Sequence, residues 1–444
     1  MYKLSKYNYF VKYEQRIIYF NGMTGFSFSV AQEEDEKLKE LFNDLISFQI
    51  QYSSIFYRLK NWGFIVNEDI DEINKIRYRN RKAIFADRFY RLIINPTQDC
   101  IFNCWYCNQH TQNMGGMKAE VVKKVKKHID VMVRDEKITG LFLDWFGGEP
   151  LMYFDEIVYP IAQYAFTLIE KYNLPFFQHA TTNAYLITQK MADEMKNIKL
   201  NSFQITLDGD EERHNKIRNV NGKPSYKRIM DNIILLCETI PDLRITIRLN
   251  YDNSTLLKSN MPLVYEQIPQ QHRNKIKLDF QRVWQTYDRS DNNNVINDSV
   301  NENRAGQKPN EPLLELKKSV ASMGYSYSMS NVFSIGQSFR CYADRYYHTV
   351  INYDGKVYKC TAHLEQEVGV LHDNGVIAWN ENIMSDLYSK ATFENERCLN
   401  CKYLPLCLGS CSQHVKYNKC MVDNSEISCE QFIISIYKQK INKQ

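Results

Sequence analysis

A chain of 444 residues is longer than a single ordinary domain, and we expect it to divide into two or three. Its 56 Lys and Arg residues against 52 Asp and Glu leave a net charge of only +4, which does not point to nucleic acid as a partner. No run of apolar residues approaches the ~18 that a membrane span requires, and the first residues lack the apolar core of a signal peptide. We therefore expect a cytoplasmic protein with no membrane partner. In that compartment its 12 cysteines favour metal ligation over disulfides.

Residues 1–85 are predicted to form a unit of their own. Strand patterns at 9–13, 16–20 and 26–30 are followed by apolar residues at helical spacing and by a short strand at 64–66. This order is similar to the winged-helix-like peptide-recognition domains that precede many peptide-modifying enzymes, which add an extended leader peptide as a strand to a sheet edge. The similarity implies a precursor peptide as partner. No residue here is chemically diagnostic, so a dimerisation or packing extension is the alternative.

From about residue 88 to 285, strand and helix patterns alternate, which predicts an α/β fold with a parallel sheet. The strands are expected at 90–95, 141–146, 176–181, 202–207, 244–250 and 276–282. The helices are expected at 117–134, 154–172, 188–198, 226–240 and 256–267. Six strands with five intervening helices indicate an open (β/α)6 partial TIM barrel over residues 86–285. In such barrels the chemistry lies at the C-terminal ends of the strands.

Three cysteines follow the first barrel strand directly. Cys100, Cys104 and Cys107 have the spacing C-x3-C-x2-C on one short loop. Three thiolates at this spacing can hold three irons of a 4Fe–4S cube and leave the fourth iron without a protein ligand, so that it can bind a substrate or cofactor. Zinc is the alternative metal, but zinc loops usually pair C-x2-C units, and the x3 gap fits poorly.

This loop, with the aromatic Tyr106 before its last cysteine, resembles the signature of the radical SAM superfamily. The resemblance implies that the open iron chelates the amino and carboxylate groups of S-adenosyl-L-methionine (SAM). It also implies that one-electron reduction then releases a 5′-deoxyadenosyl radical. Cys100, Cys104 and Cys107 are therefore expected to hold the catalytic cluster, with Tyr106 contacting SAM.

Further motifs stand at the ends of later barrel strands: Gly147-Gly148-Glu149, Thr182-Asn183, and the segments that contain Arg218 and Leu249. A pair of glycines lets the backbone approach a ligand closely, and a carboxylate beside them can accept from an ammonium group. Each motif is similar to a SAM-binding segment of the family, although Ala184 stands where the family often has glycine after Thr-Asn. An arginine suits the SAM carboxylate because its guanidinium forms a planar fork. The resemblance implies SAM contacts for Gly147, Gly148, Glu149, Thr182, Asn183, Arg218 and Leu249.

The chain changes character after the barrel. Residues 286–325 combine a polar stretch punctuated by Gly and Pro with a helix near 313–323, which indicates a linker and a bridging helix. Residues 326–444 hold most of the remaining cysteines. The turn residues at 353–356 predict a hairpin that brings Cys341 and Cys360 close together.

The C-terminal cysteines resemble the SPASM extension of radical SAM enzymes, which carries one or two auxiliary 4Fe–4S clusters. The resemblance implies that Cys341, Cys360 and Cys411 serve the nearer cluster. Cys398, Cys401, Cys407 and Cys429 would serve the farther one, and Cys420 either completes the nearer cluster or is free. A zinc ribbon is disfavoured because only Cys398 and Cys401 have the C-x2-C spacing. Cys237 lies among aliphatic residues and is predicted to be an unreactive thiol in the hydrophobic core.

These features together predict a radical SAM oxidoreductase that installs a thioether or carbon–carbon crosslink in a ribosomally synthesised precursor peptide. Its electron donor would be a protein such as flavodoxin or ferredoxin. One alternative is an anaerobic sulfatase maturase, which oxidises Cys or Ser to formylglycine; such relatives tend to carry an aspartate where this chain has Thr361. A second alternative is a non-catalytic iron–sulfur electron carrier, for which the Gly-Gly-Glu-Pro and Arg218 segments would have no purpose.

Overall fold

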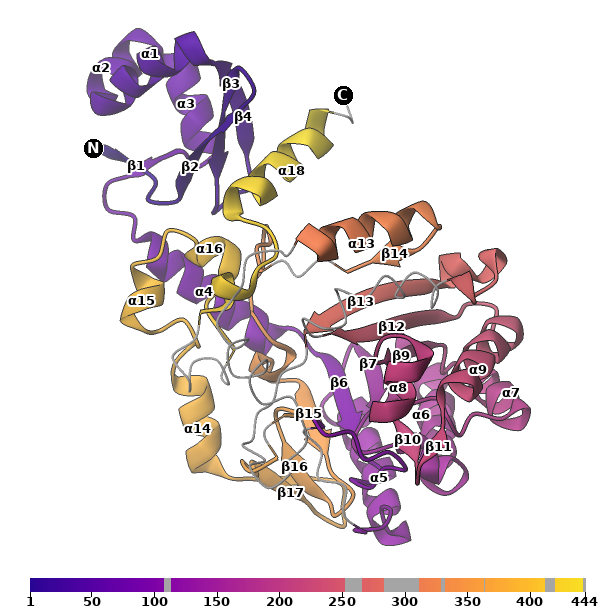
Figure 1. The fold of residues 1–444 in the computed structure, drawn as a ribbon. Helices are drawn as coiled ribbons and strands as arrows, with labels where there is room; N and C mark the ends of the chain where they lie inside the picture. Colours follow the sequence, from indigo (N-terminus) through magenta and orange to yellow (C-terminus); the bar gives the residue numbers. More distant parts are fainter. Residues whose placement is uncertain are drawn as a thin grey trace.

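The computed structural model describes residues 1–107, 113–251, 266–282, 311–328, 332–362, 364–411 and 420–441. A run of parallel strands forms the centre of the molecule (Figure 1). In order across the sheet they are β6 (Phe89–Ile94), β7 (Gly140–Trp145), β8 (Phe176–Thr182), β9 (Ser202–Leu207), β12 (Arg244–Tyr251) and β13 (Ile276–Arg282). These strands lie where the alternating patterns predict them, which confirms an α/β fold.

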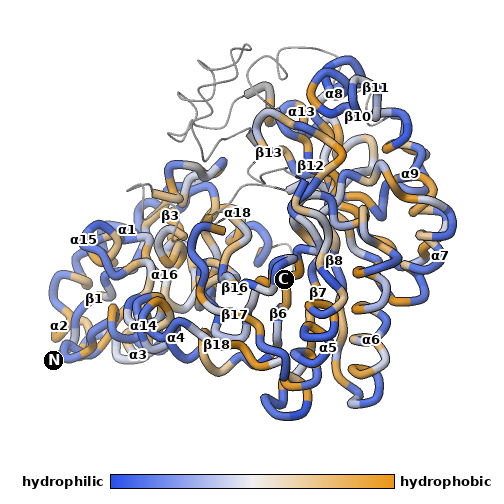
Figure 2. The backbone as a smooth tube through the Cα atoms, turned by 90° about the horizontal axis from the view of Figure 1, so that it is seen from below, coloured by the Kyte–Doolittle hydropathy of each residue, from blue (hydrophilic) through white to orange (hydrophobic). Residues whose placement is uncertain are grey.

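Helices connect these strands and lie along one side of the sheet, as Figures 1 and 2 both show. They are α5 (Ala119–Arg134), α6 (Tyr159–Lys171), α7 (Gln189–Asn197) and α9 (Tyr226–Thr239), with the short α8 (Glu211–Ile217) and the hairpin of β10 (Asn219–Val220) and β11 (Lys223–Pro224) before α9. Helix α5 shows why they pack there: Val125, Ile129 and Val133 recur on one face and are buried, while its lysines face solvent. Most of the helix predicted at 256–267 lies outside the described residues.

The sheet continues beyond the predicted barrel at both edges. After α13 (Glu311–Ser322), β14 (Ser326–Tyr327) pairs in parallel with β13. At the opposite edge β15 (His348–Ile351) pairs in parallel with β6. Antiparallel pairing then adds β16 (Lys356–Tyr358), β17 (Gly369–Leu371) and β18 (Ile377–Trp379), which gives a mixed sheet of 11 strands. The predicted hairpin at 353–356 is confirmed between β15 and β16, and strands of the cysteine-rich part belong to the same sheet as the barrel.

The N-terminal unit contains a sheet of its own, formed by β2 (Asn8–Tyr13), β3 (Arg16–Asn21) and β4 (Ser27–Ala31). A small ladder joins β1 (Tyr2–Leu4) to β5 (Ile65–Asn67). Helices α1 (Gln32–Asn43), α2 (Leu45–Gln51) and α3 (Ser53–Asn61) cover the sheet, and an aromatic core that includes Phe48, Phe56 and Phe64 is fully buried between them. Helix α4 (Glu72–Ala86) then leads into β6.

This unit packs tightly against the C-terminal cysteine region. That region contains α14 (Glu381–Ser389), α15 (Glu396–Leu399), α16 (Leu404–Cys407) and α18 (Cys429–Ile441). Val11, Ile18 and Phe20 share one buried cluster with Leu406 and Phe432. Figure 1 shows α18 alongside the N-terminal sheet, and α4 beside α15 and α16. Residues 1–85 therefore have their own elements but share a core with the end of the chain.

Candidate active site

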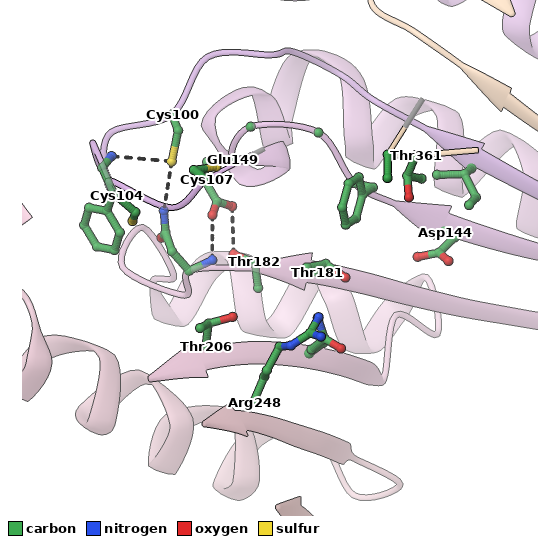
Figure 3. A pocket seen from close by; sticks show the side chains of 18 of the residues that line it. Cys100, Cys104, Cys107, Asp144, Glu149, Thr181, Thr182, Thr206, Arg248 and Thr361 are labelled. Carbon is green, nitrogen blue, oxygen red and sulfur yellow. Dashed lines mark hydrogen bonds between the residues drawn. The ribbon is translucent and has the colours of Figure 1, made fainter. Parts of the chain in front are cut away.

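The three cysteines of the C-x3-C-x2-C loop line a cavity of about 450 Å³ (Figure 3). The cavity lies at the C-terminal ends of the parallel strands, where the barrel prediction expects the chemistry. None of the 12 cysteines, all of which lie among the described residues, forms a disulfide. Ten of the predicted site residues line this one cavity: Cys100, Cys104, Tyr106, Cys107, Gly147, Gly148, Glu149, Thr182, Asn183 and Arg218.

The glycine pair fixes the position of the cysteine loop. Gly148 N–H donates to the Thr97 carbonyl at 3.0 Å, and Glu149 N–H donates to the Asp99 carbonyl at 2.8 Å. A methyl carbon at Gly148 would lie 2.0 Å from the Asp99 carbonyl oxygen, and one at Gly147 would lie 2.3 Å from the Thr97 carbonyl oxygen. The close approach that the sequence predicts for these glycines is therefore made to the chain's own backbone just before Cys100.

We expect Gly148→Ala to lower cluster loading without removing any ligand. The added methyl carbon must push residues 97–99 away, so the iron content should fall by up to about four per chain. Iron analysis of the anaerobically reconstituted protein measures this. Gly222→Ala is the control, because its positive φ of 81° strains the backbone while nothing lies within 4 Å of the added carbon. Equal iron in both variants and the wild type would contradict this role for Gly148.

Glu149 joins the ends of two strands. Its side chain is 1% exposed and accepts hydrogen bonds from Thr182 Oγ1 at 2.7 Å, Asn183 N–H at 2.7 Å and Leu151 N–H at 3.0 Å. Burial raises the pKa of this carboxyl, although these three hydrogen bonds oppose the shift. Asn183 in turn directs its Nδ2 to Cys100 Sγ at 3.8 Å. The predicted contact of Glu149 with an amino group of SAM stays a prediction beside this structural role.

Tyr106 belongs to a buried network that links the cysteine loop to two other strands. Its hydroxyl donates to Asp208 Oδ1 and Oδ2 at 2.7 and 2.6 Å, and it accepts from Arg218 Nη2 at 2.8 Å and Asn250 Nδ2 at 2.9 Å. Arg218 Nε also pairs with Asp208. Burial raises the pKa of Tyr106 well above its ordinary value, so the phenol stays protonated and keeps donating. Asp208 and Asn250 are absent from the predicted site residues, although both follow apolar strand runs in the sequence.

The side chain of Leu249 does not line the cavity, so the predicted SAM contact at this residue, which stays a prediction, would have to be made by its backbone. Side chains alternate along β12, so Arg248 and Asn250 line the cavity while Leu249 is fully buried in the hydrophobic core on the other face.

Several cavity residues were not identified from the sequence. They are the strand residues Arg91, Asp144, His179 and Gln204, together with Tyr342 beside the C-terminal cysteines. Arg91 and Asp144 form an ion pair across β6 and β7. Polar residues that interrupt buried parallel strands are the signal that points to such positions.

The C-terminal cysteines form two groups. Burial raises the pKa of Cys341 to about 12, and Asp344, Cys360 and Cys411 add to the rise, which places these three thiols near one another. Burial likewise raises the pKa of Cys407 to about 11, with Cys420 and Cys398 contributing. Cys401 contributes to the raised pKa values of Cys398 and Cys429.

Cys420 is therefore placed with the farther group. It contributes to the raised pKa values of both Cys398 and Cys407. The segment from 420 lies against residues on both sides of this group: Arg397 Nη2 is 3.4 Å from Asp423 Oδ2, and Met421 N–H donates to Ser410 Oγ at 3.2 Å. The sequence prediction that Cys420 completes the nearer cluster or is free stays a prediction.

Comparison with known proteins decides the class of this site. The chain matches the Radical SAM superfamily over residues 94–256. Residues 94–256 are a radical SAM domain. Their match begins at the end of β6 and includes the three loop cysteines, the Gly-Gly-Glu segment, Arg218 and Arg248.

Relatives extend the similarity beyond the radical SAM domain. A cysteine-type anaerobic sulfatase-maturating enzyme of Clostridium novyi (strain NT) is 24% identical over 387 residues, or 79% of this chain and 95% of its own. The structure of native anSMEcpe with bound AdoMet has a TM-score of 0.55 at 20% identity and covers 79% of this chain and 96% of its own. Streptococcus suis SuiB bound to precursor peptide SuiA has a TM-score of 0.50 at 14% identity over 97% of this chain and 99% of its own. These structural likenesses show a shared fold.

The donors of the cavity fit the cofactors that a radical SAM domain implies, a 4Fe–4S cluster and SAM. Burial raises the pKa of Cys100 to about 11 and of Cys104 to about 12, so ligation must displace their protons. Among the described residues no three His, Cys, Asp or Glu side chains converge on a single ion. In a 4Fe–4S cube each cysteine binds a different iron, so the three thiols need not converge on one ion. When bound, SAM on such a cluster supplies a 5′-deoxyadenosyl radical that removes a hydrogen atom from a substrate.

None of the described helices combines the length and the apolar character needed to cross a bilayer.

Proposed function

We propose that this chain is a radical SAM peptide maturase, which installs a thioether or carbon–carbon crosslink in a ribosomally made precursor peptide. Cys100, Cys104 and Cys107 would hold the SAM-binding cluster. The two C-terminal cysteine groups would hold auxiliary 4Fe–4S clusters in a SPASM-type region. Electrons would come from a donor such as flavodoxin or ferredoxin. Residues 1–85 would recognise the leader of the precursor.

The observation that carries this proposal is the extent of the cavity. It is lined at one end by the cysteine loop and also by Tyr342 and Thr361, the residues that directly follow Cys341 and Cys360. A substrate inside it would therefore lie between the radical source and the nearer auxiliary group. Such a position allows a substrate radical to lose its electron without leaving the protein, as forming a crosslink from two closed-shell groups requires.

The second candidate function is maturation of a cysteine-type sulfatase, which the Clostridium novyi relative supports. Two features favour the peptide maturase. Thr361 stands where sulfatase maturases are expected to carry aspartate, and its hydroxyl is 2.9 Å from the Tyr342 hydroxyl in the cavity wall. In addition, SuiB, whose solved structure contains the precursor peptide SuiA, covers nearly the whole of this chain, N-terminal unit included.

The test uses the anaerobically reconstituted full chain with SAM, a reductant and the peptide encoded by a short open reading frame beside its gene. We expect 5′-deoxyadenosine and a peptide lighter by two hydrogens for each crosslink. The same peptide without its leader should react far more slowly, because leader binding supplies affinity away from the chemistry. A cysteine peptide of the sulfatase type is the comparison. Conversion of that peptide to formylglycine, with no product from the precursor, would favour the second candidate.

A further inference from the structure

Three arginines line the cavity, and two of them are neutralised within it. Arg91 pairs with Asp144, and its guanidinium lies 4.9 Å from the centres of the Phe142 and Tyr342 rings. Arg218 pairs with Asp208 and donates to Tyr106, as described above. Each of these two cations therefore has a fixed carboxylate of the chain beside it.

Arg248 differs from both. Within the ranges that the structure describes, the Arg248 guanidinium forms no ion pair and donates no hydrogen bond, whereas Arg91 and Arg218 do both. Its neighbour across the β12–β13 ladder is Asp279, whose carboxylate accepts instead from Gln281 Nε2 at 3.0 and 3.1 Å. Burial lowers the pKa of Arg248, but a guanidinium remains charged at any physiological pH. Among the described residues, the Arg248 guanidinium thus faces the cavity without an ion pair or a hydrogen bond, and the charge of Asp279 is what offsets its burial.

Arg248 is only partly buried, and its side chain lines the cavity, so its free hydrogen-bond donors can be met by a ligand of opposite charge that enters there. In Figure 3 the guanidinium of Arg248 is directed into the cavity, on the side of Thr181 and Asp144 rather than of Cys100. This is the side away from the loop where the SAM-binding cluster would be held. The partner is thus a group of the substrate, and the planar fork of arginine matches a carboxylate.

We propose that Arg248 binds a carboxylate of the peptide substrate inside the cavity, next to the residue that is modified. This inference rests on the proposed peptide function and adds the chemistry of the residue that enters the site. The carboxylate comes from an Asp or Glu side chain or from the C-terminus of the peptide. In either case the carboxylate binds the Arg248 guanidinium on β12, and this contact orients the carbon that reacts.

The experiment measures binding of peptide pools to the reconstituted, SAM-loaded full chain. The first pool of octapeptides has a central Asp or Glu and amidated ends, and the second has Asn or Gln instead. The third repeats the second with a free C-terminal carboxylate. We expect the wild type to prefer one carboxylate pool by about tenfold or more, since a charge-assisted hydrogen bond is lost with the amide. Whether the first or the third pool is preferred identifies the source.

Variants assign the preference to Arg248. Arg248→Gln should bind all pools alike, and Arg248→Lys should keep part of the preference because it keeps the charge. Arg244→Gln, at the exposed start of the same strand, is the matched control and should keep the full preference. An unchanged preference in Arg248→Gln would overturn the inference, as would weaker SAM binding in that variant with the peptide preference intact. Equal binding of all pools by the wild type would overturn it too. Binding of no pool by the wild type would likewise overturn the inference, whereas the peptide function itself would be contradicted by a full precursor that fails to react in the assay described above.

Discussion

Replacing Cys100, Cys104 and Cys107 together by alanine is expected to remove about four irons per chain and to abolish formation of 5′-deoxyadenosine. The three thiols line the cavity, and burial keeps Cys100 and Cys104 protonated until a metal displaces their protons. The wild type should bind about 12 irons, as one SAM-binding and two auxiliary clusters. Iron analysis and chromatography of the SAM products measure the two effects.

The matched control is Cys237→Ala. Cys237 is 2% exposed on the buried side of α9 and lies far along the chain from all three cysteine groups. Its loss should leave both iron content and SAM cleavage unchanged. Stoichiometric zinc with almost no iron in the wild type would contradict the assignment of all three cysteine groups. A wild type that binds iron but does not cleave SAM would favour the alternative that the protein is a non-catalytic electron carrier.

Deleting residues 1–85 is expected to yield aggregated protein that has lost about four irons. A recognition unit that made no contact with the rest of the chain could be removed without affecting the clusters. In the structure this unit covers the farther cysteine group: Tyr9 donates to the Lys402 carbonyl, Lys6 Nζ donates to the Leu399 carbonyl at 2.9 Å, and Ser29 Oγ lies 2.6 Å from the Tyr437 hydroxyl. Its removal exposes the core around Leu406 and Phe432, between Cys401 and the end of the chain.

A pair of adjacent substitutions gives a finer test of the same contact. Tyr9 is 7% exposed and stacks on Tyr403, with ring centroids 6.3 Å apart. Phe10 points to the other face of β2, is 46% exposed and contacts only rings of the N-terminal unit in the described structure, Tyr19 and Phe42. Tyr9→Ala should destabilise the protein by about 3–5 kcal/mol and lower its iron content, whereas Phe10→Ala should affect stability alone. Full iron in Tyr9→Ala would contradict the coupling.

The sequence was most informative where local spacing decides the structure. The strands of the barrel, the cysteine loop and the hairpin before Cys360 follow from periodicity, cysteine spacing and turn residues, and the structure has them where they were expected. The partner of a side chain depends on the tertiary fold and could not be read this way. That is why the hydrogen bonds of Glu149 with Thr182 and Asn183 were not predicted, nor the lack of a hydrogen bond at Arg248 among the described residues. The packing of the N-terminal sheet on α18 has no local signal either.

The pairing of β15 with β6 has a consequence for how this chain reaches its native state. Asn95 contacts Asn352 across that ladder at a sequence separation of 257, and Lys6 reaches Leu399 at a separation of 393. Closing such long loops is slow, and during synthesis the β6 edge stays uncovered until the last quarter of the chain has left the ribosome. An open strand edge beside an apolar core is prone to aggregation. We therefore expect the pairing of β6 with β15, and the contact of residues 1–85 with the C-terminal cysteine region, to form late in folding.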